Sequence, residues 1–231
     1  MSKKIKLILA IFLILSGFFL FIYPRVTDYI YKNKVTNLKE DYIKTIESIN
    51  KEDNNLKLDE LYNLLQEENN KLYQNKQHKF LVDKTYDIAD INLSDYGLTN
   101  NIFGFIEIPV INVTLPIFLG SNDYTMTLGA THLTGTSYPI GGTNTNSVIA
   151  AHRGFYKTEM FRHIDKINIG DTLYIKNFKE TLEYKATKID IIKPDELNKL
   201  TIEEGSDMVT IISCHPFPSN THRYVVYFKR T

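Results

Sequence analysis

The sequence predicts a mainly β protein: a closed or nearly closed β-barrel that follows an N-terminal helical region and a single transmembrane helix. Short runs of β-branched and aromatic residues, separated by turn residues, fill the chain from Ile102 onward. That part lacks the long helices that connect parallel strands, which favours a barrel over an α/β sheet. Before it, an apolar run and amphipathic stripes occupy residues 1–80.

Residues 1–25 are predicted to be a cytoplasmic tail and a transmembrane signal anchor. Three lysines precede the uncharged run Leu7 to Tyr23, whose seventeen residues form about 26 Å of helix. No small-residue cleavage site follows, so an uncleaved anchor is favoured over a signal peptide. Basic residues flank both ends, and the positive-inside rule only slightly favours a cytoplasmic N-terminus. We expect a single-pass protein of the cell membrane with its folded part outside.

Residues 26–80 are predicted to form two amphipathic helices with a break near residues 50–55. Apolar residues recur mostly at spacings of three, four and seven: Leu38, Tyr42, Ile43, Ile46, Ile49, then Leu58, Leu61, Leu65 and Leu72. We expect these stripes to pack on each other or on the main domain. Residues 81–101 are acidic and without a clear period, so we interpret them as a connecting loop, either a plain linker or a lid.

Residues 102–231 are predicted to form the barrel domain, with one helical insertion at 157–167. The expected strands lie at 103–109, 113–119, 147–151, 172–175, 181–192, 208–214 and 224–229.

Composition restricts the function classes. A chain of 231 residues with 43% hydrophobic residues can build one globular domain with a core, plus appendages. The net charge is zero and the pI is near 7.0, which argues against a nucleic-acid partner. The single cysteine excludes an internal disulfide framework, and an odd thiol in an exported domain is either intermolecular or reactive.

Three candidate residues lie at predicted strand ends. Cys214 ends one strand and Arg223 begins the next, so a hairpin would bring the thiol and the guanidinium to the same rim. His152 follows another strand. A lone cysteine is more often a small buried hydrophobe, but Cys214 lies where an apolar strand meets a polar loop.

These residues fit acyl transfer. A thiolate attacks a carbonyl, an imidazole protonates the departing amine, and a cation stabilises the oxyanion. A papain-like enzyme would place its cysteine before its histidine, whereas here His152 precedes Cys214 and the third group is Arg223. A metal site built from Cys214, His215 and His222 is disfavoured, because neighbours in an extended chain point to opposite faces.

Four motifs resemble those of the sortases, the cysteine transpeptidases of Gram-positive surfaces, and most closely the class C, pilus-assembling branch. They are Ala151-His152-Arg153-Gly154, Thr131-His132-Leu133-Thr134-Gly135-Thr136-Ser137-Tyr138-Pro139, Ile211-Ile212-Ser213-Cys214 and Asn220-Thr221-His222-Arg223. The resemblance runs from about Phe103 to the end, with a similar anchor and helical lead-in before it.

The resemblance implies an eight-stranded sortase-type barrel outside the membrane and no cofactor or metal. Cys214 would cleave an LPXTG-like sorting signal through a thioacyl intermediate, with His152 as acid and base and Arg223 on the substrate or oxyanion. The acceptor would be a pilin lysine or a cell-wall precursor. Substrate-binding or supporting roles fall to His132, Thr136, Ser137, Ser213 and Asn220. Ser213 stands where the family usually has threonine.

A lid with an Asp-Pro-aromatic motif is common in class C enzymes. The corresponding residues here include Asp83 and Tyr86 without the proline, and they are the lid candidates. Two other functions stay open: a tethered barrel that binds surface proteins without catalysis, and a thiol hydrolase that only cuts sorting signals.

Overall fold

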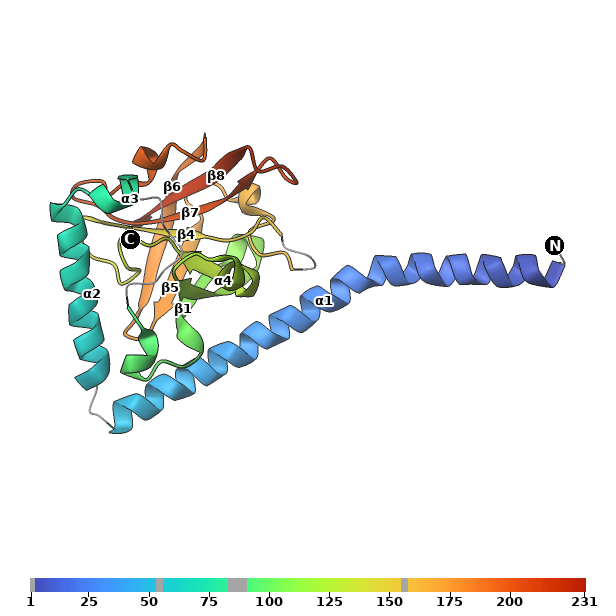
Figure 1. The fold of residues 1–231 in the computed structure, drawn as a ribbon, viewed down its shortest axis with the longest axis horizontal. Coiled ribbons are helices and arrows are strands. Elements are labelled where there is room, and N and C mark those ends of the chain that lie inside the picture. The colour runs from blue at the N-terminus through green and yellow to red at the C-terminus, as the bar shows by residue number, and fades with distance from the viewer. Residues whose placement is uncertain (1–2, 53–55, 83–90, 155–157) are drawn as a thin grey trace.

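A 50-residue helix begins the fold. The computed structural model describes residues 3–52, 56–82, 91–154 and 158–231, and α1 (Lys3–Glu52) fills the first of these ranges. Its N-terminal part reaches a mean hydropathy of 2.7 and none of that part is buried against protein, so it is apolar and long enough to cross a membrane. The helix contains Pro24, which removes a helical hydrogen bond, and Figure 1 shows that α1 bends.

The second half of α1 packs on the barrel. Val35, Tyr42 and Ile49, seven residues apart, are buried, and the Tyr42 hydroxyl donates to the Phe103 carbonyl at 2.6 Å. α2 (Leu56–Gln74) follows and buries Leu58, Leu61, Leu65 and Asn69. α3 (His78–Val82) ends the helical region. The buried residues of both stripes therefore join the apolar cluster that contains the barrel core, whereas Ile43 of the first stripe is exposed.

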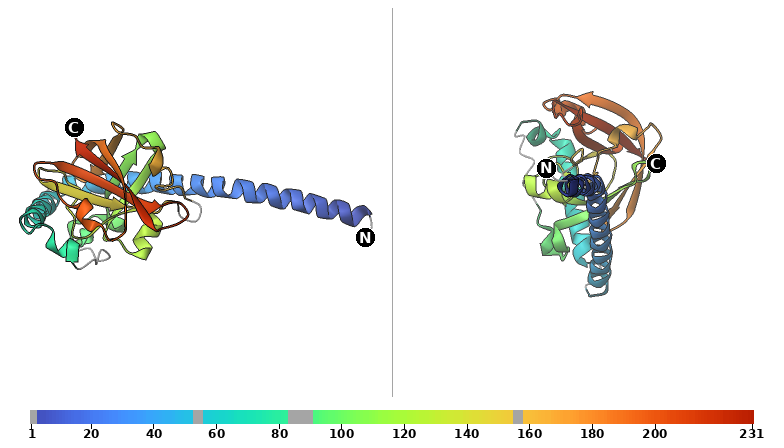
Figure 2. Two further views of the ribbon diagram at one scale, coloured as in Figure 1. Left: turned by 90° about the horizontal axis from the view of Figure 1, so that it is seen from above. Right: turned by 90° about the vertical axis from the view of Figure 1, so that its right-hand side faces the viewer.

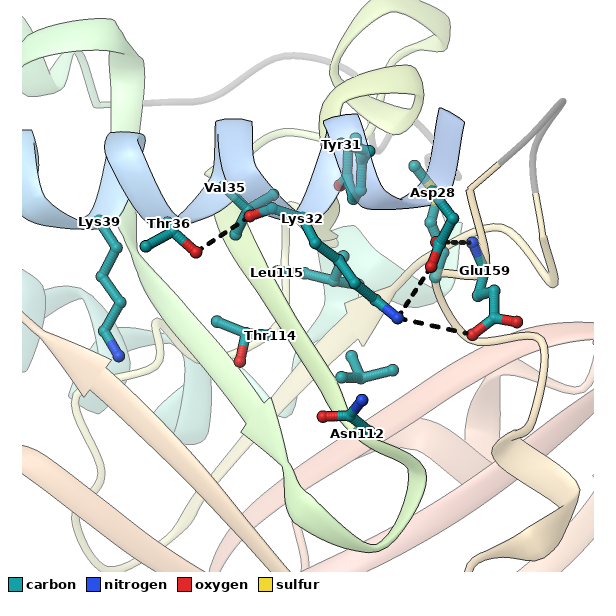
Figure 3. A pocket seen from close by; sticks show the side chains of 12 residues that line it. Asp28, Tyr31, Lys32, Val35, Thr36, Lys39, Asn112, Thr114, Leu115 and Glu159 are labelled. Carbon is teal, nitrogen blue, oxygen red and sulfur yellow. Dashed lines mark hydrogen bonds and ion pairs between the residues drawn. The ribbon is translucent and has the colours of Figure 1, made fainter. Parts of the chain in front are cut away.

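The turns of α1 nearest the apolar part also touch loops of the barrel. Figure 3 shows Lys32 pointing between Asp28, at 2.8 Å, and Glu159, at 3.9 Å. The Tyr31 hydroxyl donates to the carbonyl of Leu128 at 2.9 Å. These contacts border a cavity of about 280 Å³ between α1 and β2, which none of the candidate catalytic residues lines.

Eight strands close into a barrel, as predicted. They are β1 (Ile102–Ile108), β2 (Val113–Leu119), β3 (Ala130–His132), β4 (Thr145–Ala150), β5 (Thr172–Asn177), β6 (Thr181–Ile192), β7 (Asp207–His215) and β8 (His222–Arg230). Their order around the barrel is β1-β2-β3-β4-β7-β8-β6-β5. Two pairs, β2 with β3 and β4 with β7, are parallel, and the others are antiparallel. Figures 1 and 2 show α1 and α2 beside this barrel.

Some elements differ from those predicted. β3 has only three residues and was not expected. α4 (Asp123–Leu128) was not expected either, although Asn122 and Thr125 form a capping box at its start. The predicted helical insertion is wrong over its described part: residues 158–167 contain only the 3-10 turn η4 (Ile164–Lys166), and Met160 has a φ of 40° that no α-helix accommodates.

The predicted connection at 81–101 is ordered where the structure describes it. Residues 91–101 contain two 3-10 turns, η1 (Leu93–Tyr96) and η2 (Thr99–Asn101). Leu93 and Leu98 are fully buried in the apolar cluster that also holds residues of α1, α2 and the barrel. This part therefore packs as a connection between the helices and β1. Another 3-10 turn, η5 (Leu197–Leu200), follows β6.

Candidate active site

Cys214 and Arg223 lie side by side on neighbouring strands. They are direct partners in the antiparallel register of β7 with β8, and both are half-buried. Side chains of such partners lie on the same face of the sheet with their Cβ atoms about 5 Å apart. The hairpin geometry expected from the sequence is therefore present, and the thiol and the guanidinium share one rim.

The end of β4 brings His152 to the same place. β4 and β7 are parallel with Ala150 opposite Ile212, and counting two residues along each strand puts His152 level with Cys214. Two hydrogen bonds extend the pairing beyond β4. The Ala151 N–H donates to the Ile212 carbonyl at 3.3 Å, and the Ser213 hydroxyl donates to the Ala151 carbonyl at 2.8 Å. Because Ser213 is buried, it links the histidine segment directly to the cysteine segment.

The three candidate catalytic residues line one cavity of about 260 Å³. The other lining residues are mostly apolar. They come from α4 and the residues before it, the segment after β3, the end of β4, the end of β6 with the segment that follows it, and β7: Ser121, Met126, Leu133, Ala150, Ala151, Ile192, Lys193, Pro194, Leu197, Leu200, Ile212 and Ser213. A cavity with apolar walls and few convergent polar groups is typical of a site that binds part of a substrate.

The environment of His152 favours its neutral form. Burial lowers the pKa of His152 below its usual 6.5, because the charged imidazolium loses solvation, and the carboxylate of Asp123 on α4 opposes that shift. The imidazole is therefore neutral at pH 7 and can accept a proton. Asp123 was not predicted as part of this site. Asn122, which caps the start of α4, is the signal in the sequence that marks the helix carrying Asp123.

Arg223 turns its guanidinium toward the β7–β8 loop. Nη1 donates to the carbonyl of Asn220 at 2.8 Å and to the carbonyl of His222 at 3.0 Å. No carboxylate of the described residues forms an ion pair with Arg223. Within the part of the chain that the structure describes, its charge is therefore not neutralised by a carboxylate, and its remaining N–H groups are able to bind an anion. Asn220 takes part through its backbone carbonyl.

Arg153 has a different environment from Arg223. It is buried, and one face of its guanidinium packs over the Tyr224 ring at 5.5 Å. Its polar partners are Asp165 at 2.9 Å, His215 Nδ1 at 2.7 Å, and the carbonyls of Cys214 and Arg162, both at 3.4 Å. These contacts occupy the guanidinium and hold the backbone at Cys214. They give Arg153 a structural role.

His132, Thr136 and Ser137 lie behind the cavity and do not line it. His132 Nε2 is within hydrogen-bond distance of the carbonyls of Thr136 and Ser137, and its ring stacks on Tyr138 at 5.2 Å. The Thr136 hydroxyl donates to the Leu133 carbonyl at 2.8 Å. These residues shape the turn that carries Leu133, which does line the cavity. Sequence reasoning missed the apolar wall formed by Ile192, Leu197 and Leu200.

The lid candidates Asp83 and Tyr86 lie outside the described residues. Among residues 3–52, 56–82, 91–154 and 158–231, no group of three or more His, Cys, Asp or Glu side chains is arranged to hold a metal ion. The Nδ1 atom of His215 contacts Arg153. Burial lowers the pKa of His215, and the positive charge of Arg153 lowers it further.

Known proteins with similar sequences are sortases. The Sortase domain family model matches residues 106–231, more than half of the chain. Sortase D of Bacillus subtilis is 27% identical over 135 residues, which are 57% of this chain and 65% of that protein. Sortase A of Bacillus anthracis is 27% identical over 125 residues, which are 54% and 58%. The chain thus spans about three fifths of the length of these relatives.

Solved structures similar to this one include pilus-related enzymes. Sortase C1 of GBS Pilus Island 1 superposes with a TM-score of 0.76 and 27% identity, over 85% of this chain and 98% of that one. The pilus-related sortase C of Group B Streptococcus has a TM-score of 0.70 and 33% identity, over 81% and 96%. Sortases are cysteine transpeptidases, and the matched region contains the cavity with Cys214, His152 and Arg223. By its sequence and its barrel, this chain belongs to the sortase family.

Proposed function

We propose that this chain is a membrane-anchored cysteine transpeptidase that cuts an LPXTG-like sorting signal and transfers it to an amine. The observation that carries the proposal is the register that places His152, Cys214 and Arg223 around one apolar cavity. The family membership adds the reaction class, because sortases act on LPXTG-type substrates and amine acceptors. Each residue has a role that its environment supports.

Acylation uses His152 first as base and then as acid. The neutral imidazole takes the proton of the Cys214 thiol, and the thiolate attacks the carbonyl carbon of the signal's threonine. A C–S bond forms, and the carbonyl oxygen becomes an oxyanion that Arg223 stabilises. The imidazolium then protonates the nitrogen of the following glycine as the C–N bond breaks. The products are a thioacyl enzyme and a free amine.

In deacylation His152 again acts first as base and then as acid. His152 accepts a proton from the incoming amine as that amine attacks the thioacyl carbonyl. The new C–N bond forms, the C–S bond breaks, and the proton returns to Cys214. Ser213 supports both halves by linking Ala151, next to His152, to the strand of Cys214.

We propose a pilin lysine as the acceptor. The support is the similarity to two solved sortases whose descriptions name pili, the GBS Pilus Island 1 enzyme and the pilus-related sortase C. Sortases named A and D are also similar to this chain, so the amine of a cell-wall precursor is the acceptor to test against lysine.

We also propose that α1 anchors the enzyme in the membrane with the barrel outside. The apolar part of α1 is long enough to span a membrane. The lysines at positions 3, 4 and 6 precede that part and favour a cytoplasmic N-terminus. Residues 1–25 then act as tail and anchor, 26–80 as a helical support, and 102–231 as the catalytic barrel.

Mass spectrometry of the full chain in nanodiscs tests the chemistry. The chain is mixed with an LPXTG-type peptide, then with the peptide plus a pilin or a peptidoglycan-type amine. We expect a thioacyl adduct on Cys214 that moves to the pilin lysine as an isopeptide. Cys214→Ala should abolish the adduct, and Arg223→Ala should slow transfer by about 100- to 1000-fold. Lys229→Ala, on the same strand but paired with Glu203, is the matched control and should keep wild-type rates.

Each other outcome excludes part of the proposal. Normal turnover by a folded Cys214→Ala protein would refute the mechanism. Transfer only to the peptidoglycan-type amine would reassign the enzyme to wall anchoring. Release of the cut peptide as a free carboxylic acid, in an amount that added amines do not lower, would identify a hydrolase. Binding of surface proteins that survives Cys214→Ala, without any adduct, would identify a binding protein.

A further inference from the structure

The short helix α3 contacts the turn η5 at the wall of the active-site cavity. Figure 1 shows α3 at the end of α2, and it contacts η5, which carries the lining residues Leu197 and Leu200. Gln77, just before α3, is 1% exposed. Its Oε1 accepts from the Ile202 N–H at 2.6 Å, directly beyond η5. Gln77, in the helical region, is thus hydrogen-bonded to the backbone just after η5.

Gln77 also reaches a second part of the cavity wall, the segment that carries Leu133. Its Nε2 donates to the Gly135 carbonyl at 3.5 Å, in the turn after β3 that carries Leu133. One buried amide therefore bonds to the backbone of both walls, with an acceptor on one side and a donor on the other. A buried amide is costly to leave unpaired, so the two walls are held at the separation that satisfies both ends.

Phe80 packs against residues of the same two parts of the cavity wall. It is 1% exposed and belongs to an apolar cluster with Leu133, Ile192, Leu197, Leu200 and Ile212, all of which line the cavity. Within that cluster it is the one member from before residue 102 among the described residues. Packing is close: a Cβ at Gly135 would lie 3.1 Å from the Phe80 Cβ. Loss of the ring would leave a void under the cavity walls.

We infer that Gln77 and Phe80 are positioning residues that set the width of the cavity and so its selectivity for the apolar residue of the sorting signal. Neither residue lines the cavity or touches the reacting atoms. They act through Leu133 on one side and through Leu197 and Leu200 on the other. The helical region, outside the 106–231 match, is then part of the substrate-recognition apparatus. This inference rests on the proposed function, because it assumes that the cavity takes the signal peptide.

Binding of a dansyl-labelled LPXTG peptide to the full chain in nanodiscs tests the inference. The measurement uses the Cys214→Ala background, so that affinity is read without turnover. We expect Gln77→Met and Phe80→Ala each to raise Kd about tenfold, the loss typical of one imperfect contact in an apolar pocket. The ratio of Kd for a peptide with alanine in place of the leucine to Kd for the LPXTG peptide should fall in both variants. Phe80→Leu should recover most of the affinity and most of this ratio. In the active protein, KM should rise while kcat stays within about twofold.

Leu65→Ala is the matched control. Leu65 is fully buried in the other apolar cluster, so its loss destabilises the helical region without touching the cavity walls. At matched loss of Tm it should leave Kd and the leucine preference unchanged. Equal effects of Leu65→Ala, or an unchanged leucine preference in both Gln77→Met and Phe80→Ala, would overturn the inference. If peptide binding behaves as expected but the wild-type chain forms no adduct, the inference stands and the proposed chemistry fails.

Discussion

Replacing Ser213 by alanine removes the hydrogen bond that joins the histidine segment to the cysteine strand. The hydroxyl donates to the Ala151 carbonyl at 2.8 Å, and both residues are buried. A hydrogen bond of this kind contributes about 1 kcal/mol, and the cost rises toward 1–3 kcal/mol when the buried partner is left unsatisfied. We expect Ser213→Ala to lose about 1–2 kcal/mol of unfolding free energy, which is a Tm lower by about 2–8 °C in a chain of this size.

The catalytic effect of Ser213→Ala should exceed the effect on stability. His152 follows Ala151, so its alignment with Cys214 depends on this bond. A displacement near 1 Å costs up to about 100-fold in rate, and we expect kcat for acyl transfer to fall about 10- to 100-fold. The assay is peptide transfer kinetics with thermal denaturation of the same preparations. Ser213→Thr keeps the donor and should stay close to wild type.

Two results would refute this reasoning. If Ser213→Ala matches wild type in both Tm and kcat, the bond does not align His152. If Ser213→Thr is impaired as strongly as Ser213→Ala, then side-chain volume at this position matters, and the hydroxyl does not.

Two further predictions concern pH and packing. Because burial lowers the folded-state pKa of His152 below 6.5, the unfolded chain binds this proton first as pH falls. The unfolding free energy of the wild-type chain should therefore fall relative to that of His152→Gln as pH drops below about 6.5, and the two should change in parallel above that value. Denaturant titrations of both proteins between about pH 5 and 8 measure this difference, and the absence of a divergence at low pH would contradict the prediction. At Gly104, a Cβ would lie 2.3 Å from the Lys176 carbonyl oxygen across the β1–β5 pair. We expect Gly104→Ala to lose more than about 3 kcal/mol or to fail to fold, whereas Gly17→Ala, with open space around it, should keep the wild-type Tm.

Local patterns in the sequence predicted most of the barrel. The runs at 113–119 and 181–192 coincide with β2 and β6, since both are rich in β-branched and other apolar residues. β3 was not predicted, because three residues are too few to show a strand pattern. Residues 158–167 read as helical from composition, yet the positive φ of Met160 is a property of the folded loop. The break expected near residues 50–55 falls partly on residues 53–55, outside the described residues; α1 continues to Glu52 and α2 starts at Leu56.

The candidate site was predictable only where chemistry and strand ends coincide. Cys214, His152 and Arg223 stood out because they lie at the ends of apolar runs. The apolar wall at Leu197 and Leu200 did not, because nothing local distinguishes a cavity wall from a core. Gln77 could not be found either. Its two partners are 58 and 125 residues away in sequence, so only the fold reveals that one amide bridges them.

The placement of the three catalytic candidates follows from the two different neighbours of β7. A parallel neighbour brings together residues at the same strand end, which places His152 after β4 level with Cys214 near the end of β7. An antiparallel neighbour brings the end of one strand to the start of the next, which places Arg223 beside Cys214. A purely antiparallel meander would put the residue after β4 at the opposite rim from Cys214. The parallel β4–β7 pair is therefore the feature of the fold on which the site depends, and Ser213 holds that pair together just beyond its last regular residue.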